Sequence, residues 1–235
     1  MVSLVEDADG TLRALVDHLG HDLEPSILIG GWATYLRVGG PISHDIELII
    51  GNDSVRQKIQ ERLDELHKTS HLQGEKWSGS VDGVHLDIYI PYSSQLGDKL
   101  RLRVEVLSKH VEPSPDAAQR WLLLIIEAHT ISKMAALLDR SSSPKGVKDA
   151  NEVLALLRKG VDGRRAVDIL ADATAGPVSN ITDHVERALT LVAERGDTNR
   201  ADRKWLDGLR REWIDYATLA VRVREQGVRP GPTLS

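Results

Sequence analysis

Two acidic residues stand two positions apart in a short apolar segment near the start of the chain. Asp45 and Glu47 flank Ile46 in a run that ends at Ile50. Successive side chains of a β-strand point to opposite faces, so a strand here would place both carboxylates on one face and Ile46 and Leu48 on the other. Neighbouring carboxylates repel each other unless a cation joins them, and Mg²⁺ prefers carboxylate and phosphate oxygens. The pair predicts a divalent-metal site, although an edge strand with a charged outer face would show the same pattern.

A glycine pair precedes these acids and a third acid follows them. Gly30 and Gly31 end the apolar run 26–29, which indicates a strand that enters a tight turn before a helix. Backbone amides at such a turn can bind a phosphate, but a simple turn is the other interpretation. Asp87 stands alone in the apolar segment 85–90. If this segment lies beside the acid pair, Asp87 completes a three-carboxylate site and can help to activate an incoming hydroxyl.

Short strands and helices must position these residues. The expected helices cover residues 12–19, 32–38 and 53–68, and the expected strands cover residues 26–29, 46–50, 75–80, 84–90 and 100–107. Asp82-Gly83 predicts a hairpin turn, and Pro91 is expected to end the strand that follows it. Beyond Pro115 only helices are expected, over residues 116–138, 146–158, 164–172, 180–195 and 201–224. The sequence therefore predicts an α+β protein, with a mixed-sheet domain at residues 1–112, an all-helical domain at 113–226 and a disordered tail at 227–235.

Composition limits the function further. The net charge of −5 argues against a general nucleic-acid coat protein. Basic residues nevertheless gather near the C-terminal end, and they predict either a solvated helix surface or an RNA-facing patch: Arg195, Arg200, Arg203, Lys204, Arg210, Arg211, Arg222, Arg224 and Arg229. The absence of cysteine excludes disulfides, thiolate metal sites and cysteine nucleophiles.

Location and aromatic content add two expectations. The acidic N-terminal segment lacks a signal pattern and the longest apolar run, 121–126, is too short to span a bilayer, so a cytoplasmic protein without a membrane partner is expected. Trp121, Trp205 and Trp213 are interpreted as helix packing rather than as base-stacking platforms. The histidine spacing shows no zinc motif, and His44 is expected to face the core.

The order of these motifs resembles the DNA polymerase β-like nucleotidyltransferase superfamily. The residues that carry the resemblance are Ile29-Gly30-Gly31, Ser43-His44-Asp45-Ile46-Glu47-Leu48 and Leu86-Asp87-Ile88. A second block, His129 to Arg140 followed by Lys148 to Leu157, is similar to the K-x-x-A-L-x-x-R and K-D-x-x-D signature of AbiEii-type abortive-infection toxins and the related MenT-type toxins. Glu152 takes the last acidic place. The two blocks cover residues 26–158.

The resemblance implies roles for individual residues. Gly30 and Gly31 would cradle the triphosphate of an NTP with Ser43 nearby, and Mg²⁺ would bind Asp45 and Glu47, joined by Asp87. The helical domain would contribute Lys133, which reaches the nucleotide, and Asp149, which closes the site, with help from Arg140 and Lys148. The residue pattern alone would place Lys133 on a solvated helix surface, although its apolar neighbours fit a functional lysine. Pro41 stands where many relatives have arginine, and Glu47 where aspartate is common.

The resemblance also implies a function. The chain would transfer a nucleoside monophosphate from an NTP to an acceptor hydroxyl, the tRNA 3′ end, and would arrest growth as a toxin. Such a toxin has a cognate antitoxin, either a protein partner or a kinase, for which Ser43 is the candidate target. Two alternatives stay open: a nucleotidyltransferase of the type that modifies aminoglycosides, and a degenerate member of the fold that only binds.

Overall fold

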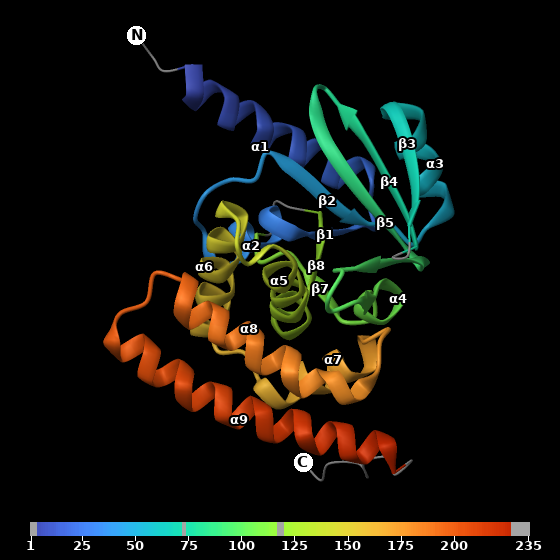
Figure 1. Cartoon of the computed structure of the whole chain (residues 1–235). Helices are drawn as coiled ribbons and strands as arrows, with labels where there is room; N and C mark the ends of the chain where they lie inside the picture. The colour runs from blue at the N-terminus through green and yellow to red at the C-terminus, as the bar shows by residue number, and fades with distance from the viewer. Residues whose placement is uncertain (1–3, 72–73, 117–119, 227–235) are drawn as a thin grey trace. The chain divides into compact units, whose positions relative to one another are not determined.

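The computed structural model describes residues 4–71, 74–116 and 120–226, and the chain divides into two compact units (Figure 1). The sheet unit comprises the chain up to residue 95 together with residues 107–125, and the helical unit comprises residues 96–106 and the chain from residue 126 onward. The protein is therefore of the α+β class, with a mixed sheet toward the N-terminus and helices toward the C-terminus. The sheet unit extends beyond Glu112, where the composition of the sequence changes.

The sheet unit is built on strands in the order β3-β4-β5-β2-β1-β8-β7. Their bounds are β1 Ile27–Ile29, β2 Asp45–Ile49, β3 Asp64–His71, β4 Gly74–Val81, β5 Val84–Leu96, β7 Val111–Pro113 and β8 Leu122–Leu124. The sheet is mixed, because β2 runs antiparallel to β1 but parallel to β5, and β1 runs parallel to β8.

One face of the central strands forms the core of the sheet unit. Ile46, Leu48, Leu86 and Ile88 are fully buried, as the alternation along their strands predicts. They form one hydrophobic cluster with residues from three helices, α1 Leu4–Asp22, α2 Gly30–Val38 and α3 Asp53–Arg62. The opposite face of the same strands is consequently left to the polar side chains.

The expected hairpin is confirmed, but two expectations nearby are wrong. Asp82 and Gly83 both have positive φ, at 52° and 76°, between β4 and β5. The helix expected over residues 53–68 ends at Arg62, because the following residues pair with β4 as β3. Pro91 does not end β5: the pairing register with β4 shifts past Tyr89, and this irregularity accommodates the proline, which has no N–H.

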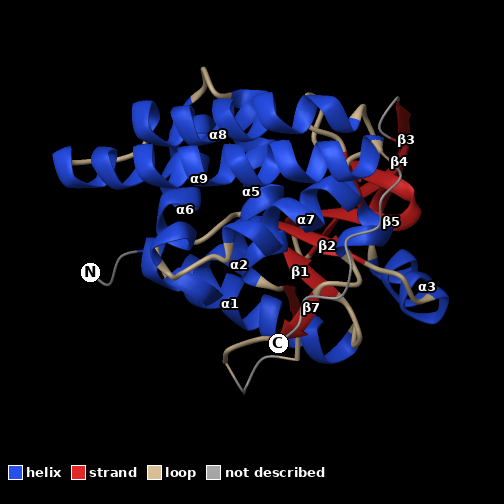
Figure 2. Cartoon of the chain, turned by 90° about the horizontal axis from the view of Figure 1, so that it is seen from below, coloured by secondary structure: helices blue, strands red, loops and turns tan. Residues whose placement is uncertain are grey.

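The helical unit contains α5 Ile126–Arg140, α6 Pro144–Arg158, α7 Gly163–Ala173, η1 Val178–Asn180, α8 Ile181–Arg195 and α9 Arg200–Glu225. Several helices begin at a side-chain cap: Ser143 accepts a hydrogen bond from the Gly146 amide, and Asn199 forms a capping box with Asp202. Helices α8 and α9 pack side by side (Figures 1 and 2). The four helices expected from residue 146 onward are confirmed to within about two residues.

Two expected elements at the start of this region are wrong. The helix expected over residues 116–138 begins only at Ile126, because Leu122–Leu124 is strand β8. The strand expected over residues 100–107 is reduced to β6 Leu102–Arg103, followed by helix α4 Val104–Leu107. The disorder expected for residues 227–235 lies outside the described residues. Within the described ranges, no helix combines the length and the apolar character needed to cross a membrane.

Candidate functional site

The acid pair lies on the polar face of β2. Asp45 is exposed and Glu47 half-buried, whereas Ile46 between them is fully buried. The parallel pairing of β2 with β5 sets Asp45 beside His85 and Glu47 beside Asp87. Neighbours in register share a face of the sheet, so all three predicted carboxylates lie on one face, and two of them are direct neighbours.

The glycine turn lies directly against this face. Strand β1 ends at Ile29, α2 begins at Gly30, and Ile29 pairs with Glu47 across the strands. Gly30 has a φ of +67°, and a Cβ on Gly30 would collide with the Glu47 carboxylate. Ile29 is the N-cap of α2, and its apolar side chain makes no capping hydrogen bond. The Ile29 side chain therefore does not occupy the backbone amides at the start of α2. The structure therefore brings the glycine turn and the second acid of the pair together.

Ser43 and His44 lie in the segment that precedes β2. Ser43 is half-buried and His44 is exposed. The expectation that His44 faces the core is wrong, because β2 begins only at Asp45 and strand alternation does not extend back to residue 44.

Asp87 has two partners that the sequence analysis missed. Its Oδ2 lies 3.0 Å from the Lys76 Nζ of β4, and its Oδ1 lies 3.2 Å from the His85 Nε2. Lys76 alternates with Ser78 and Ser80 along β4. That alternation could have assigned Lys76 to the polar face, but its approach to Asp87 depends on the β4–β5 register.

The three carboxylates are the type of ligand that a divalent cation prefers. Their oxygens do not, however, point toward one common position. Asp45 and Glu47 supply the oxygen ligands that Mg²⁺ prefers. Both oxygens of Asp87 contact Lys76 or His85 instead. Accordingly, no group of three or more His, Cys, Asp or Glu side chains is arranged to hold a metal ion within the described ranges.

The second predicted set of residues forms a buried ionic cluster between α5 and α6. The Lys133 Nζ lies 2.6 Å from the Glu152 Oε2 and 3.9 Å from the Asp149 Oδ1. Arg140 donates two hydrogen bonds to Asp149, of 2.5 and 2.9 Å, and Lys148 lies 3.8 Å from Glu152. These three cations and two carboxylates are called the α5–α6 cluster below.

Burial sets this cluster apart from an ordinary helix surface. Lys133, Asp149 and Glu152 are each less than 10% exposed. The interpretation of Lys133 as a solvated residue is therefore wrong. Charges taken out of water persist only when they are paired, and here Lys133 and Arg140 supply the pairing for both carboxylates. The structure brings Lys133, Arg140, Lys148 and Asp149 together, and their predicted part in nucleotide transfer stays a prediction.

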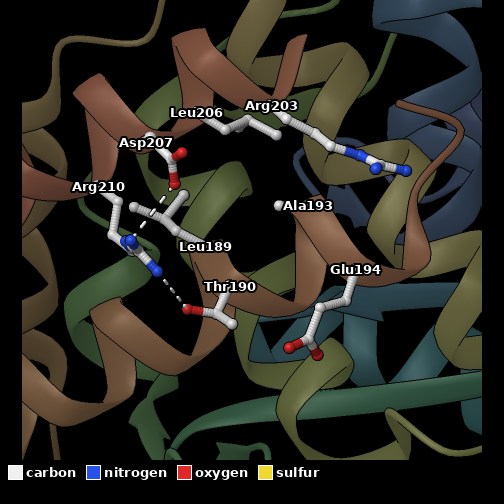
Figure 3. A pocket seen from close by; sticks show the side chains of 8 residues that line it. All are labelled: Leu189, Thr190, Ala193, Glu194, Arg203, Leu206, Asp207 and Arg210. Atoms are coloured by element: carbon white, nitrogen blue, oxygen red, sulfur yellow. Dashed lines mark hydrogen bonds and ion pairs between the residues drawn. The ribbon is translucent and has the colours of Figure 1, made fainter. Parts of the chain in front are cut away.

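A pocket of about 410 Å³ lies between α8 and α9 of the helical unit (Figure 3). No predicted site residue lines it. Arg210 at its rim donates a hydrogen bond of 3.2 Å to Thr190 and forms an ion pair of 3.3 Å with Asp207. The floor is apolar, with Leu189, Ala193 and Leu206. Because the Arg210 guanidinium is already engaged, this pocket offers no free anion site at that residue.

Comparison with solved structures finds partial likenesses to several proteins, among them three of nucleotidyltransferase type. A protein of Thermotoga maritima described as a candidate nucleotidyltransferase is 14% identical, with a TM-score of 0.44, over 64% of this chain and 94% of that one. An antigenic nucleotidyltransferase-like protein of Paracoccidioides brasiliensis is 15% identical, with a TM-score of 0.45, over 81% and 95%. ANT(2″)-Ia, solved with adenylyl-2″-tobramycin, is 14% identical, with a TM-score of 0.47, over 70% and 96%.

No protein-family model matches the chain, and no curated protein matches its sequence.

Proposed function

We propose that the chain is a Mg²⁺-dependent nucleotidyltransferase that moves a nucleoside monophosphate from an NTP to an acceptor hydroxyl. The observation that carries the proposal is the placement of Glu47 between Gly30 and Asp87. A glycine turn at a helix N-terminus, which favours a phosphate, lies against a carboxylate that favours a cation. NTP complexes of Mg²⁺ present both groups at once.

The residues divide the chemistry between them. Asp45 and Glu47 would hold the cation, which would neutralise the negative charge that develops on the phosphates. The acceptor oxygen attacks the α-phosphorus, the bond from that phosphorus to the bridging oxygen breaks, and pyrophosphate leaves with the electron pair. Asp87 is the candidate acceptor for the hydroxyl proton. Amides at the start of α2, exposed by Gly30 and Gly31, bind the triphosphate, with Ser43 close in sequence.

The proposed acceptor is the 3′ end of tRNA, and the proposed role is that of a growth-arresting toxin with a cognate antitoxin. The support is the sequence resemblance of the α5–α6 cluster to AbiEii-type and MenT-type toxins. In this proposal Lys133 serves the nucleotide and Asp149 holds Lys133 in position, with a distance of 3.9 Å between them.

One transfer experiment tests the activity. Full-length protein is incubated with each α-labelled NTP, Mg²⁺, total tRNA and a panel of small hydroxyl acceptors. Asp45→Asn removes a metal ligand, and we expect transfer to fall by at least about 100-fold, by loss of a charge that stabilises the transition state. Asp82→Asn is the matched control, because it makes the same change at an exposed turn whose positive φ asparagine tolerates.

Each outcome has a distinct meaning. Label on tRNA that depends on Asp45 supports the proposal. Label only on a small acceptor supports the aminoglycoside-type alternative and overturns the tRNA assignment. Equal absence of transfer in the wild type and in Asp45→Asn overturns the enzymatic function and leaves a binding module of the same fold.

A further inference from the structure

Helix α9 carries a row of exposed cations on one side. Arg200, Lys204, Arg211 and Arg222 are all exposed, and none forms an ion pair with a carboxylate within the described ranges. Their spacings of four, seven and eleven residues are close to whole turns of a helix with 3.6 residues per turn. These four residues are called the outer stripe. Asp207, Asp215 and Glu225 are exposed on the same side, so the four cations and these acids together carry a net charge of about +1.

Three other arginines of the unit are held in ion pairs. Arg210 pairs with Asp207, Arg224 with Asp172 and Arg158 with Asp202, at 3.3, 2.6 and 2.7 Å. The four cations of the outer stripe have no carboxylate partner within the described ranges, although the Arg211 Nε donates a hydrogen bond of 3.1 Å to the Asp207 carbonyl. They share this lack of an ion pair with other exposed cations of the unit, such as Lys159 and Arg165, and differ from those in forming a row along one helix.

An exposed tryptophan lies about 100° round the helix axis from the Lys204 position of this stripe. Trp205 follows Lys204 directly and is 39% exposed, whereas Trp121 and Trp213 are buried. The interpretation of Trp205 as a packed side chain is therefore wrong. Trp121 and Trp213 are buried, as that interpretation expects. A large exposed aromatic ring beside unpaired cations is the combination that binds single-stranded nucleic acid, by stacking together with phosphate contacts.

Gly208 strengthens this argument because nothing in the fold requires it. It lies one turn after Trp205, inside a helix of 26 residues, where glycine is less favourable than alanine by about 1 kcal/mol. A Cβ at Gly208 would meet no atom within 4 Å, and Gly208 is not among the glycines with positive φ. Neither packing nor backbone conformation explains the residue. A partner that approaches the helix closely beside Trp205 does.

We propose that the outer stripe of α9 binds the phosphate backbone of RNA, with Trp205 stacked on an unpaired base and Gly208 giving the strand room to approach. This inference rests on the proposed function in naming the RNA, which is the tRNA whose 3′ end accepts the nucleotide. At a rise of about 1.5 Å per residue the stripe extends over about 33 Å, enough for several successive phosphates. An acidic protein would satisfy the cations but would not need a bare indole ring beside an unsubstituted helix position.

Binding is measured with full-length protein, deacylated tRNA and a short single-stranded RNA, by fluorescence anisotropy without NTP over a series of salt concentrations. We expect the Lys204→Gln/Arg211→Gln variant to weaken binding and to reduce the slope of log affinity against log salt by about 2. The Lys159→Gln/Arg165→Gln variant is the matched control, because it removes two exposed cations from the same unit, off α9. It should leave affinity and slope unchanged.

Two further variants test the stacking. Trp205→Ala should lower the affinity for single-stranded RNA at least about fivefold. Gly208→Ala should raise the thermal midpoint of the protein while it weakens RNA binding, a combination that a merely structural glycine would not produce. Because Gly208→Ala favours the helix, a loss of binding cannot be attributed to unfolding.

The results separate this inference from the proposed function. If the stripe variant and the control bind RNA equally, or if Gly208→Ala binds as the wild type does, the stripe is not an RNA surface, even when the wild type labels tRNA. If the stripe and tryptophan variants lose RNA binding while no protein transfers a nucleotide, the proposed enzymatic function fails and the RNA surface stands.

Discussion

Gly30 joins two constraints in a single position. Its φ of +67° disfavours any side chain, and the Glu47 carboxylate occupies the space that a Cβ would need. We expect Gly30→Ala to lower the free energy of unfolding by about 3 kcal/mol, from backbone strain and from the collision together. Urea unfolding of the full chain measures the change.

Gly83, in the turn between β4 and β5, separates the two causes. Its φ of +76° also disfavours a side chain, but a Cβ there would meet no atom within 4 Å. Gly83→Ala should therefore cost only about 1 kcal/mol. Equal losses for the two variants would show that Glu47 does not hold its position against Gly30.

Lys133 is the buried cation that pairs most closely with Glu152. We expect Lys133→Met to lower the free energy of unfolding by about 3–5 kcal/mol, because it leaves Glu152 buried without its 2.6 Å partner. Lys148→Met is the comparison, since Lys148 is 37% exposed and 3.8 Å from the same carboxylate, and it should cost less than about 1 kcal/mol. Thermal unfolding of both variants measures the losses. Similar losses for Lys133→Met and Lys148→Met would contradict the expected difference.

Much of the sheet site could be predicted from single residues, because strand alternation depends only on local spacing. Asp45, Glu47 and Asp87 follow from alternation. Lys76 did not, because its contact with Asp87 depends on how β4 and β5 pair, and that register shifts at an irregularity. The exposure of Trp205 was missed for a related reason: composition does not show which side of a helix is covered.

At the scale of elements, α8 contains a histidine that should make stability depend on pH. Burial lowers the pKa of His184, an effect that the charge of Asp183 opposes, and its Nδ1 is buried without a hydrogen-bond partner. Protonation is then easier in the unfolded chain, so stability falls as pH drops through the unfolded pKa of about 6.5.

The measurement is the free energy of unfolding at pH 7.5 and at pH 5.5. His184→Gln should reduce the loss between these values. An unchanged loss in His184→Gln would assign the effect to other groups.

Helix α9 begins at a complete capping box, and α8 does not. The Asn199 side chain accepts hydrogen bonds from two amides, and Asp202 bonds back to the Asn199 amide. Asn199→Ala should cost about 1 kcal/mol in chemical unfolding. Asn180, the N-cap of α8, makes no side-chain cap, so Asn180→Ala should be nearly neutral. A comparable cost at both positions would argue against the capping role.

Elements with a strong period were predicted well, and those decided by pairing were not. The amphipathic helices α6 to α9 follow from spacing within one segment. Residues 64–68 continue an apparent helix, but pairing with β4 makes residues 64–71 a strand. The apolar run at 121–125 fits a buried strand or a buried helix equally, and only its neighbour β1 decides between them.

For the whole molecule, the toxin proposal predicts an effect on living cells. Induced expression of the wild-type chain in a bacterial host should arrest growth, because uncharged tRNA accumulates when its 3′ end is blocked. Cells that express Asp45→Asn should grow normally, and cells that express Asp82→Asn should stop growing as they do with the wild type. Colony counts after induction measure the effect, with protein levels matched by blotting. Growth arrest by the Asp45→Asn variant would show that toxicity does not depend on nucleotide transfer.

The discontinuity of the sheet unit has a consequence for the order in which the protein can form during translation. Strand β1 pairs with β8, so Leu28 cannot pair until the ribosome has added Leu123, 95 residues later. Residues 96–106, which belong to the helical unit, emerge before the sheet is complete. Contacts between distant residues slow folding. A nascent chain released at residue 112 would lack β8 and expose the edge of β1, so premature termination there should yield an aggregating product rather than a separable domain.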